Sequence, residues 1–299
     1  MSTTTTPSPA TAQLETKLSV SVLIPAYNEE DSIVATVETI SKQREYADLE
    51  IIVINDGSKD RTGEIARTLP VTLIEHETNY GYGAALKTGM QHAKHDYIMI
   101  VDADGTYPLE DIPRLMKEAP HCDMVVGART GDVVHVPMMR KPGKWIITRL
   151  AEYLSAQKIP DLNSGFRVFR KSVALQFLPL YPDGFSFTTT ITLAMLTNHY
   201  RVKFLSINYH KRVGKSSIHP VRDFTNFTIL IIRICACFKP LNVFVPPALV
   251  MILLGLIKST RDYLVGGHIG ILAMILVVTG VQMLFIGLLA DLIDRRMKL

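Results

Sequence analysis

The sequence is poor in the residues that cross-link small secreted folds. It has only three cysteines, Cys122, Cys235 and Cys237, and their spacing fits neither a disulfide framework nor a set of metal ligands. A reducing, cytosol-facing environment therefore fits the chain best. The N-terminal stretch 1–17 lacks the apolar core of a signal peptide, and its composition, rich in Thr, Pro, Ser and Ala, predicts a disordered leader.

The chain also lacks a strong charge of either sign. Its formal net charge of +4 is small for 299 residues. No stretch interleaves basic and aromatic residues as a nucleic-acid-binding surface does, so nucleic acid is not an expected partner. A chain of this length can bury a sizeable core, and one or two domains are expected.

Residues 18–204 alternate between short β-branched runs and segments with helical periodicity. Strands are predicted at 20–24, 50–54, 71–74, 97–101 and 124–126, and helices at 30–43, 61–68 and 83–93. Because the strands are almost continuously apolar and helices separate them, we expect an α/β fold with a mostly parallel sheet covered on both faces. Ligands of such sheets bind at the carboxyl ends of the strands.

Three polar clusters fall at these predicted strand ends. They read PAYNEE at 25–30, NDGSKD at 55–60 and DADGTY at 102–107. Each has an ordinary structural explanation, since Asn28 and Asp60 could cap the following helices and Asp104-Gly105 could form a turn. Asp56 is better placed to accept hydrogen bonds from a base or a ribose. Three such loops at one sheet edge favour a ligand site over capping alone.

Asp102 and Asp104 lie one residue apart, directly after a predicted buried strand. Two carboxylates at this spacing can hold a hard divalent cation, which keeps its other positions for water and phosphate oxygens. The pair alone is a weak signal, and an acidic turn is the alternative. Its position beside two other polar loops favours a metal site.

The composition changes beyond residue 221. Residues 241–257 and 269–290 carry no charge, and a membrane-spanning helix needs about 20 apolar residues. The second run predicts a transmembrane helix. The first is short and contains Pro246-Pro247, so a buried helix of a soluble protein is the alternative. Two such runs joined by a short loop favour a transmembrane hairpin, and the apolar stretch 224–238 suits a helix lying along the membrane surface.

Basic residues flank the predicted hairpin on both outer sides. They are Arg222, Arg233 and Lys239 before it, and Arg295, Arg296 and Lys298 after it. The loop inside the hairpin holds Lys258, Arg261 and His268, so the excess is modest, but it favours both outer ends in the cytoplasm. The expected location is the inner cell membrane. Such hairpins often associate, which makes a homo-oligomer an expectation.

Five segments together carry a family resemblance. They read LIPAYNEE at 23–30, VINDGSKDRT at 53–62, NYGYGAALKTG at 79–89, VDADGTYP at 101–108 and NSGFRVFRK at 163–171. In this order they resemble the family 2 glycosyltransferases, in particular dolichyl-phosphate mannose synthases and bacterial polyprenyl-phosphate glycosyltransferases. The resemblance implies a Rossmann-like nucleotide-diphospho-sugar transferase domain of GT-A type at 18–217, a juxtamembrane helical region at 218–239, and a transmembrane hairpin with a basic tail at 240–299.

The resemblance also implies donor-binding roles for individual residues. Pro25, Tyr27 and Glu29 would line the nucleotide pocket, with Asp56 reading the base or the ribose. Asp102 and Asp104 would hold Mg²⁺ or Mn²⁺ on the donor diphosphate.

A second implied set consists of basic residues around the acceptor. Arg129 in VVGAR resembles the arginine that binds the acceptor phosphate, and Arg140 and Lys144 match a second basic pair on the acceptor loop. Arg212 in KRVGKSS would clamp the donor diphosphate. Asp104, Arg129 and Arg212 would thus be the catalytic residues, although a lone arginine could otherwise be a solvated surface charge.

The implied reaction moves one hexose from a UDP- or GDP-linked sugar to an undecaprenyl or dolichyl phosphate, with inversion, at the cytoplasmic membrane face. A cation and an arginine would stabilise the leaving diphosphate. The acceptor phosphate is already an anion, so no general base is required. Two positions depart from the family pattern: Thr106 stands where many relatives have glutamine, and Thr190 where many have glutamate. Asp161 could have a structural role or bind the sugar.

Three other functions fit the sequence less well. A processive polysaccharide synthase would carry a Q-x-x-R-W signature and more membrane spans, and neither is found. A membrane-tethered binding protein without catalysis would be expected to have lost the aspartate pair, which is intact. A soluble dinucleotide-binding enzyme is disfavoured because GYGAALKTG lacks the full G-x-G-x-x-G after the first strand.

Overall fold

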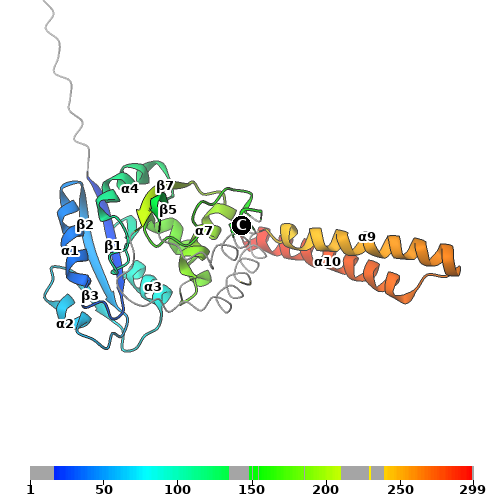
Figure 1. Cartoon of the computed structure of the whole chain (residues 1–299), viewed down its shortest axis with the longest axis horizontal. Coiled ribbons are helices and arrows are strands. Elements are labelled where there is room, and N and C mark those ends of the chain that lie inside the picture. Colours follow the sequence, from blue (N-terminus) through cyan, green and yellow to red (C-terminus); the bar gives the residue numbers. More distant parts are fainter. Residues whose placement is uncertain are drawn as a thin grey trace, which may run out of the picture.

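Seven strands of the chain form one mixed sheet in the order β3-β2-β1-β4-β6-β5-β7 (Figure 1). The computed structural model describes residues 17–134, 148–149, 151–153, 155–184, 186–209, 229 and 239–297. The strands are β1 (Leu18–Ala26), β2 (Ala47–Asn55), β3 (Thr72–Glu75), β4 (Tyr97–Ile100), β5 (Met124–Val134), β6 (Arg167–Arg170) and β7 (Val202–Tyr209). Only β6 runs antiparallel to its neighbours, so the prediction of a mostly parallel sheet is confirmed.

All five predicted strands are present, and two further strands were not predicted. The missed strands have weak apolar signals. β6 is four residues long with an arginine at each end, and β7 has a single buried residue, Ile207, because it lies at the edge of the sheet.

Helices cover both faces of the sheet. They are α1 (Ile33–Lys42), α2 (Thr62–Arg67), α3 (Tyr82–His92), α4 (Ile112–Glu118), α6 (Lys171–Gln176) and α7 (Phe187–Thr197). Apolar residues of α1, α2 and α4 share one buried cluster with one face of the strands, and those of α3, α6 and α7 share another with the opposite face. The central strands are therefore buried on both sides, as their continuous apolar sequence indicates.

The register of the central strands brings three loops to one edge. β1 pairs in parallel with β2 up to Ala26 and Asn55, and with β4 up to Leu23 and Ile100. The loops that follow β1, β2 and β4 therefore leave the sheet on the same side. These loops hold the three polar clusters of the sequence.

Two long helices, α9 (Pro240–Gly266) and α10 (Ile271–Met297), project together from one end of the α/β domain (Figure 1). Their apolar segments have mean hydropathies of 2.1 and 2.5, and only 17% of the residues in each are buried. A buried core helix, the alternative for the run 241–257, does not fit this exposure. The helix also continues past that run to Gly266, where Gly267 adopts a left-handed conformation that ends it.

Small residues line the contact between α9 and α10. A Cβ atom at Gly255 would lie 2.7 Å from Val277 Cγ2, and one at Gly280 would lie 2.6 Å from Ile252 Cγ1. Close backbone approach at glycine is the usual way in which helices pack in a membrane, where no hydrophobic effect drives them together. Both helices are long and apolar enough to cross a bilayer.

The start of α3 is covered by a segment that is distant in the sequence. The backbone N–H groups of Gly83 and Ala84 donate to the carbonyl of Asp183, at 2.7 and 3.0 Å. A Cβ atom at Gly83 would lie 2.0 Å from the carbonyl oxygen of Pro182. The two glycines of this Gly-x-Gly therefore allow another chain segment to pack closely against the loop. This packing role agrees with the conclusion that the loop is not a dinucleotide-binding motif.

We expect Gly83→Ala to destabilise the domain because its methyl group meets backbone atoms that cannot move without breaking the two hydrogen bonds. Overpacking of this kind costs about 1–3 kcal/mol. The midpoint of thermal unfolding, measured on the detergent-solubilised chain, should fall by several degrees. Gly184→Ala is the matched control, since a Cβ atom there meets nothing within 4 Å. Equal midpoints for the two variants would contradict the prediction.

Candidate active site

The loops after β1 and β2 are tied to each other by hydrogen bonds. Asn28, with φ of 57°, accepts the backbone N–H of Lys59 through Oδ1 at 2.8 Å, and its own N–H donates to Ser58 Oγ at 3.0 Å. Asn28 therefore does not cap the following helix, and that prediction is wrong: α1 begins at Ile33, with Ser32 at its N-cap. The amide of Asn28 joins two loops instead.

Asp60 does hold the start of α2. Its Oδ1 atom accepts the N–H of Thr62 at 3.0 Å and the hydroxyl of Thr62 at 2.6 Å, and α2 begins at Thr62. Its Oδ2 atom accepts the N–H of Glu30 at 3.2 Å. The N-cap position of α2 is Arg61, so Asp60 lies one residue before it. Its carboxylate bonds the first residue of the helix and links the second loop to the first.

The residues predicted to bind the nucleotide lie at this edge. Pro25 is half-buried in β1, Tyr27 is 41% exposed just beyond the strand, and Glu29 accepts the hydroxyl of Ser32 at 2.9 Å. Tyr80, which the sequence gave no reason to select, is 54% exposed. Its N–H donates to Asp56, so it lies beside the same loop.

Asp56 is buried and organises the loop before α3. Its carboxylate accepts the N–H groups of Tyr80 and Gly81, at 3.0 and 2.8 Å, and lies 2.7 Å from His76 Nδ1. His76 Nε2 in turn lies 3.0 Å from Thr88 Oγ1. The carboxylate thus has three protein partners before any ligand arrives, and its contact with a base or a ribose stays a prediction.

Asp102 is held between the partly buried Tyr82 and the buried Gly165. The hydroxyl of Tyr82 donates to Asp102 Oδ1 at 2.8 Å. Burial, followed by the nearby Asp102 charge, raises the pKa of Tyr82 well above its ordinary value, so the phenol remains a donor. On the other side, a Cβ atom at Gly165 would lie 2.7 Å from Asp102 Oδ2, so a larger residue there would displace the carboxylate.

Asp104 is oriented by Thr106, the residue that departs from the family pattern. Asp104 Oδ1 accepts the hydroxyl of Thr106 at 2.7 Å and its N–H at 3.2 Å. Thr106 is fully buried, so its hydroxyl is directed at the carboxylate rather than at solvent. The turn interpretation of Asp104-Gly105 is also confirmed, with Gly105 in the left-handed region at φ of 67°.

The donor set of this loop fits a divalent cation that is shared with a ligand. Asp102 and Asp104 supply hard carboxylate oxygens and are fixed by Tyr82 and Thr106. Within the described ranges, no group of three or more His, Cys, Asp or Glu residues could hold a metal ion. A cation here would therefore need phosphate oxygens or water to complete its coordination, which is the usual arrangement for Mg²⁺.

Arg129, whose side chain is 19% exposed, forms an ion pair with the fully buried Asp161. Its Nε and Nη2 atoms donate to the two carboxylate oxygens at 2.6 and 2.9 Å, and the ring of Tyr209 lies 5.1 Å from its Cζ atom. Although burial alone would lower the pKa of Arg129, the hydrogen bonds to Asp161 keep it well above its ordinary value. The interpretation of Arg129 as a solvated surface charge is wrong, and Asp161 has the structural role that was one of its two alternatives.

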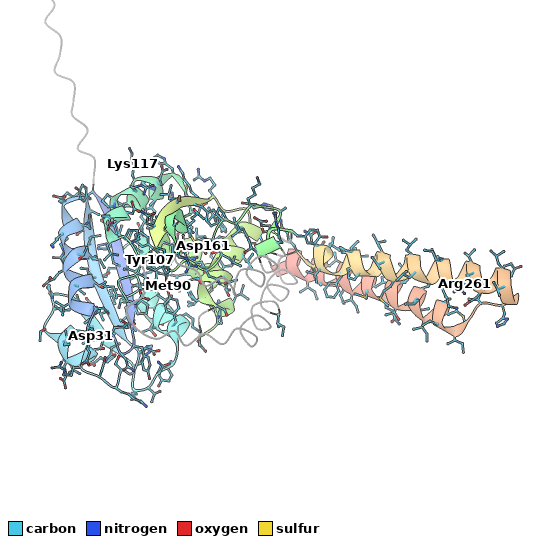
Figure 2. The ribbon with its side chains drawn as sticks, in the orientation of Figure 1. Asp31, Met90, Tyr107, Lys117, Asp161 and Arg261 are labelled. Carbon is cyan, nitrogen blue, oxygen red and sulfur yellow. The ribbon has the colours of Figure 1, made fainter. Side chains whose placement is uncertain are left out.

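The segment Asp161–Phe166 joins these groups. Asn163 Oδ1 accepts the hydroxyl of Thr189 at 2.6 Å, Ser164 Oγ donates to the carbonyl of Gly127 at 2.6 Å, and Gly165 N donates to the hydroxyl of Tyr107 at 2.7 Å. In Figure 2, Tyr107 and Asp161 lie in the interior of the α/β domain, with Asp161 nearer the hairpin in this view.

Three of the predicted site residues cannot be placed. Arg140, Lys144 and Arg212 lie outside the described residues. Thr190, one of the two positions expected to depart from the pattern that the sequence resembles, is buried in α7 and donates to the carbonyl of Ser186 at 2.9 Å.

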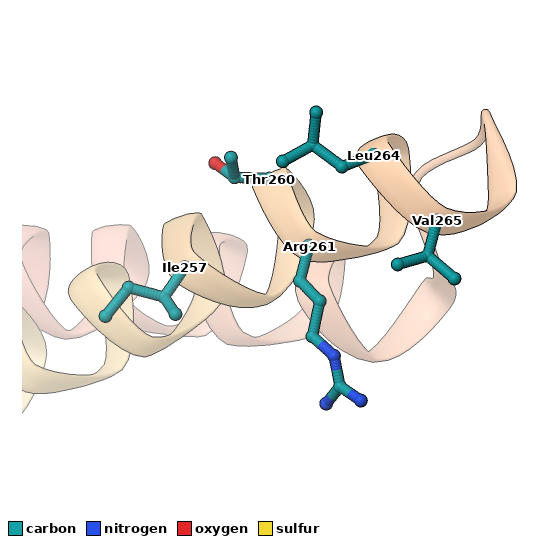
Figure 3. Close-up of a pocket in the computed structure, with 5 residues that line it drawn as sticks. All are labelled: Ile257, Thr260, Arg261, Leu264 and Val265. Carbon is teal, nitrogen blue, oxygen red and sulfur yellow. The ribbon is translucent and has the colours of Figure 1, made fainter.

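Two shallow depressions lie away from these residues. Figure 3 shows one on α9, near the far end of the hairpin, lined by Ile257, Thr260, Arg261, Leu264 and Val265. The other is lined by residues between Arg149 and Lys158. Neither contains a predicted site residue.

Comparison with known proteins decides the family. The family model described as glycosyl transferase family 2 matches residues 21–177, and that of the GtrB C-terminal hairpin matches residues 239–295. The chain belongs to glycosyl transferase family 2. This glycosyltransferase is 28% identical over 219 residues to a dolichyl-phosphate hexose transferase of Haloferax volcanii, covering 72% of this chain and 92% of the relative.

Two further proteins resemble this glycosyltransferase. A dolichyl-phosphate β-glucosyltransferase of Trichomonas vaginalis is 30% identical over 248 residues, covering 75% of each chain. The crystal structure of glucosyl-3-phosphoglycerate synthase from Mycobacterium tuberculosis, in complex with Mn²⁺, UDP and phosphoglyceric acid, superposes with a TM-score of 0.56 at 16% identity, covering 73% of this chain and 78% of that one. The GT-A type of fold and the C-terminal hairpin are thus confirmed.

We expect Asp161→Asn to destabilise the enzyme strongly. The amide would leave the largely buried Arg129 guanidinium without a counter-charge and would point N–H groups at it, a change that costs about 3–5 kcal/mol. The control is Asp183→Asn, which removes the exposed partner of Lys87. Thermal unfolding should report a large loss of stability for the first variant and a small one for the second. A stable Asp161→Asn variant would show that the ion pair does not hold this part of the site together.

Proposed function

We propose that this glycosyltransferase moves one hexose from a UDP- or GDP-linked sugar to a polyprenyl phosphate, either undecaprenyl or dolichyl. One chain combines two features, and this combination carries the proposal. The Asp102–Asp104 loop lies at the ligand-binding edge of a GT-A domain, and an apolar hairpin is attached to that domain. A soluble acceptor would need no such hairpin. A lipid acceptor has its phosphate at the membrane surface, where the hairpin would keep the domain.

Relatives support both substrates. Two are named for dolichyl phosphate as the acceptor of a hexose or a glucose. The structural neighbour binds Mn²⁺ together with UDP. We extend a nucleotide-linked donor and a divalent cation, Mg²⁺ or Mn²⁺, to this chain because the fold is shared and Asp102 and Asp104 form an acidic pair at the edge where sheets of this kind bind ligands.

In the proposed reaction an oxygen of the lipid phosphate attacks the anomeric carbon, and the bond from that carbon to the nucleoside diphosphate breaks. Attack from the face opposite the leaving group inverts the anomeric configuration. The nucleophile is already an anion, so the residues must position and desolvate it rather than remove a proton. Asp104 and Asp102 would hold the cation, which when bound neutralises charge on the leaving diphosphate.

The chain's own residues divide this work. Tyr82 and Thr106 fix the orientations of Asp102 and Asp104, so these carboxylates need little rearrangement when the donor binds. Arg129, preorganised by Asp161, would contact the acceptor phosphate with the part of its guanidinium that Asp161 does not occupy. Arg140 and Lys144 would add positive charge for the acceptor, and Arg212 would contact the donor diphosphate.

We place α9 and α10 in the inner cell membrane, with the catalytic domain on the cytoplasmic side. The basic residues that flank the hairpin support this orientation. The hairpin exposes apolar side chains along both helices and could also contact further copies of the chain, so a homo-oligomer is part of the proposal.

The purified full-length chain tests the proposal with a panel of radiolabelled UDP- and GDP-hexoses and a short-chain polyprenyl phosphate. We expect one donor to give a labelled lipid in the presence of Mg²⁺ or Mn²⁺. The absence of transfer to lipid with every donor would refute the proposal. Transfer to a soluble acceptor alone would show that the chain is a glycosyltransferase whose acceptor is not a polyprenyl phosphate.

Removal of the metal site is expected to abolish transfer. Asp104→Asn should lower kcat at least about 100-fold, since it removes charge stabilisation from the leaving group. Thr106→Val, which removes only the hydroxyl bonded to Asp104, should raise the Mn²⁺ concentration for half-maximal activity about 10-fold. Glu110→Gln, on an exposed residue near the same loop, is the control. Full activity of wild type in excess EDTA would contradict the assignment.

The role of Arg129 at the acceptor can be separated from its role in stability. Replacing both members of the ion pair, in Arg129→Met with Asp161→Leu, avoids a lone buried charge and should retain much of the stability. This double variant should raise the KM for the polyprenyl phosphate about 10-fold or more, because a charged hydrogen bond to phosphate is lost, and should leave the donor KM little changed. A folded double variant with normal acceptor KM would show that Arg129 is only structural.

A further inference from the structure

Arg167 is the largest fully buried side chain in the described part of the protein. It opens β6 and pairs in register with Ile100, two residues before Asp102, and with Val126, three residues before Arg129. No carboxylate among the described residues forms an ion pair with it. A buried cation without a counter-ion costs several kcal/mol, so its presence at this place in the sheet calls for an explanation.

The guanidinium is satisfied by neutral oxygen atoms from two separate elements. Nε donates to the carbonyl of Ser164 at 3.0 Å, and Nη2 donates to the same oxygen. Nη1 donates to the carbonyl of Thr188 at 3.1 Å and to Thr192 Oγ1 at 2.9 Å. Burial lowers the pKa of Arg167 to about 10, so the side chain remains charged at neutral pH.

These contacts place Arg167 between α7 and the segment Asp161–Phe166. One end of that segment holds Arg129 through Asp161, and the other end packs Gly165 against the carboxylate of Asp102. Only three residues separate Asp161, which holds the group proposed to contact the acceptor phosphate, from Gly165, which packs against the group proposed to serve the donor diphosphate. The position of this short segment sets how the two sites face each other.

We propose that Arg167 is a positioning residue that anchors the segment Asp161–Phe166 to α7 and thereby sets the alignment of the donor and acceptor sites. It touches neither substrate. The inference rests on the proposed function, since it assigns the two ends of the segment to two substrates. A role in stability alone would not predict that its loss acts on kcat while binding of each substrate is retained.

The kinetic test uses the full-length chain with the donor and the short polyprenyl phosphate that wild type accepts. Arg167→Met should lower kcat about 100-fold, because a misalignment of about 1 Å between reacting groups has an effect of this size. The KM values for donor and acceptor should each change less than about threefold, because the variant should still bind each substrate and lose only the alignment between them. Arg167→Lys, which keeps the charge but not the forked set of donors, should recover part of kcat.

Two further variants keep the test decisive. Thr192→Val removes one acceptor of Arg167 at nearly constant volume, and it should lower kcat about 10-fold with unchanged KM values, even if Arg167→Met does not fold. Arg170→Met changes the half-exposed arginine at the other end of β6, which contacts Asp123 and Pro120, and should behave like wild type. Thr192→Val with wild-type kcat, or with raised KM values and unchanged kcat, would overturn the proposal.

Amide hydrogen exchange tests the anchor without any substrate. In Thr192→Val the amides of Asn163 and Gly165 should exchange faster than in wild type and in Arg170→Met. If wild type transfers sugar to no lipid, the proposed function fails, and this measurement still decides whether Arg167 anchors the segment. Unchanged exchange at both amides would refute the anchoring role.

Discussion

The site depends on the contact between Gly165 and the carboxylate of Asp102. The glycine lies so close that a single methyl group in its place would overlap an oxygen of the aspartate. This contact joins a loop that follows β4 to a segment that precedes β6, and the antiparallel pairing of these two strands is what brings them together. From Gly165 the same short segment reaches Asp161, whose ion pair fixes Arg129 on β5. The sheet order therefore places the two proposed substrate sites on opposite ends of one piece of chain.

The proposed donor side of the site is held together by a second set of contacts. Three side chains tie neighbouring loops together. Their oxygen atoms accept hydrogen bonds from backbone N–H groups of those loops, and they belong to Asp56, Asp60 and Asn28. Polar residues that resemble ligands thus hold the loops, and the side chains of Tyr27 and Tyr80 beside them are exposed. In the proposed function these exposed rings would be available to a nucleotide. Such preorganisation lowers the entropy lost when a ligand binds.

Much of this arrangement could be predicted from the sequence. Continuous apolar runs located β1, β2 and β4, and the parallel sheet that they imply brings PAYNEE, NDGSKD and DADGTY to one edge. Contacts between distant residues could not be predicted in this way. The pair of Arg129 and Asp161 is separated by 32 positions, and no periodicity links it. Asn28 is a residue type that often caps helices, but its backbone is left-handed. Its side chain therefore bonds the next loop instead. The buried Arg167 shows no apolar pattern at all, and its role follows only from α7 and β6 being neighbours.

The central claim is that this glycosyltransferase forms one inverted glycosidic bond to a lipid phosphate. The most direct measurement is the structure of the lipid product, made from a donor labelled with ¹³C at the anomeric carbon and analysed by mass spectrometry and NMR. The account predicts a lipid with one hexose linked through phosphate, with anomeric configuration opposite to that of the donor. A polymer, a retained configuration, or free hexose without any lipid product would contradict it.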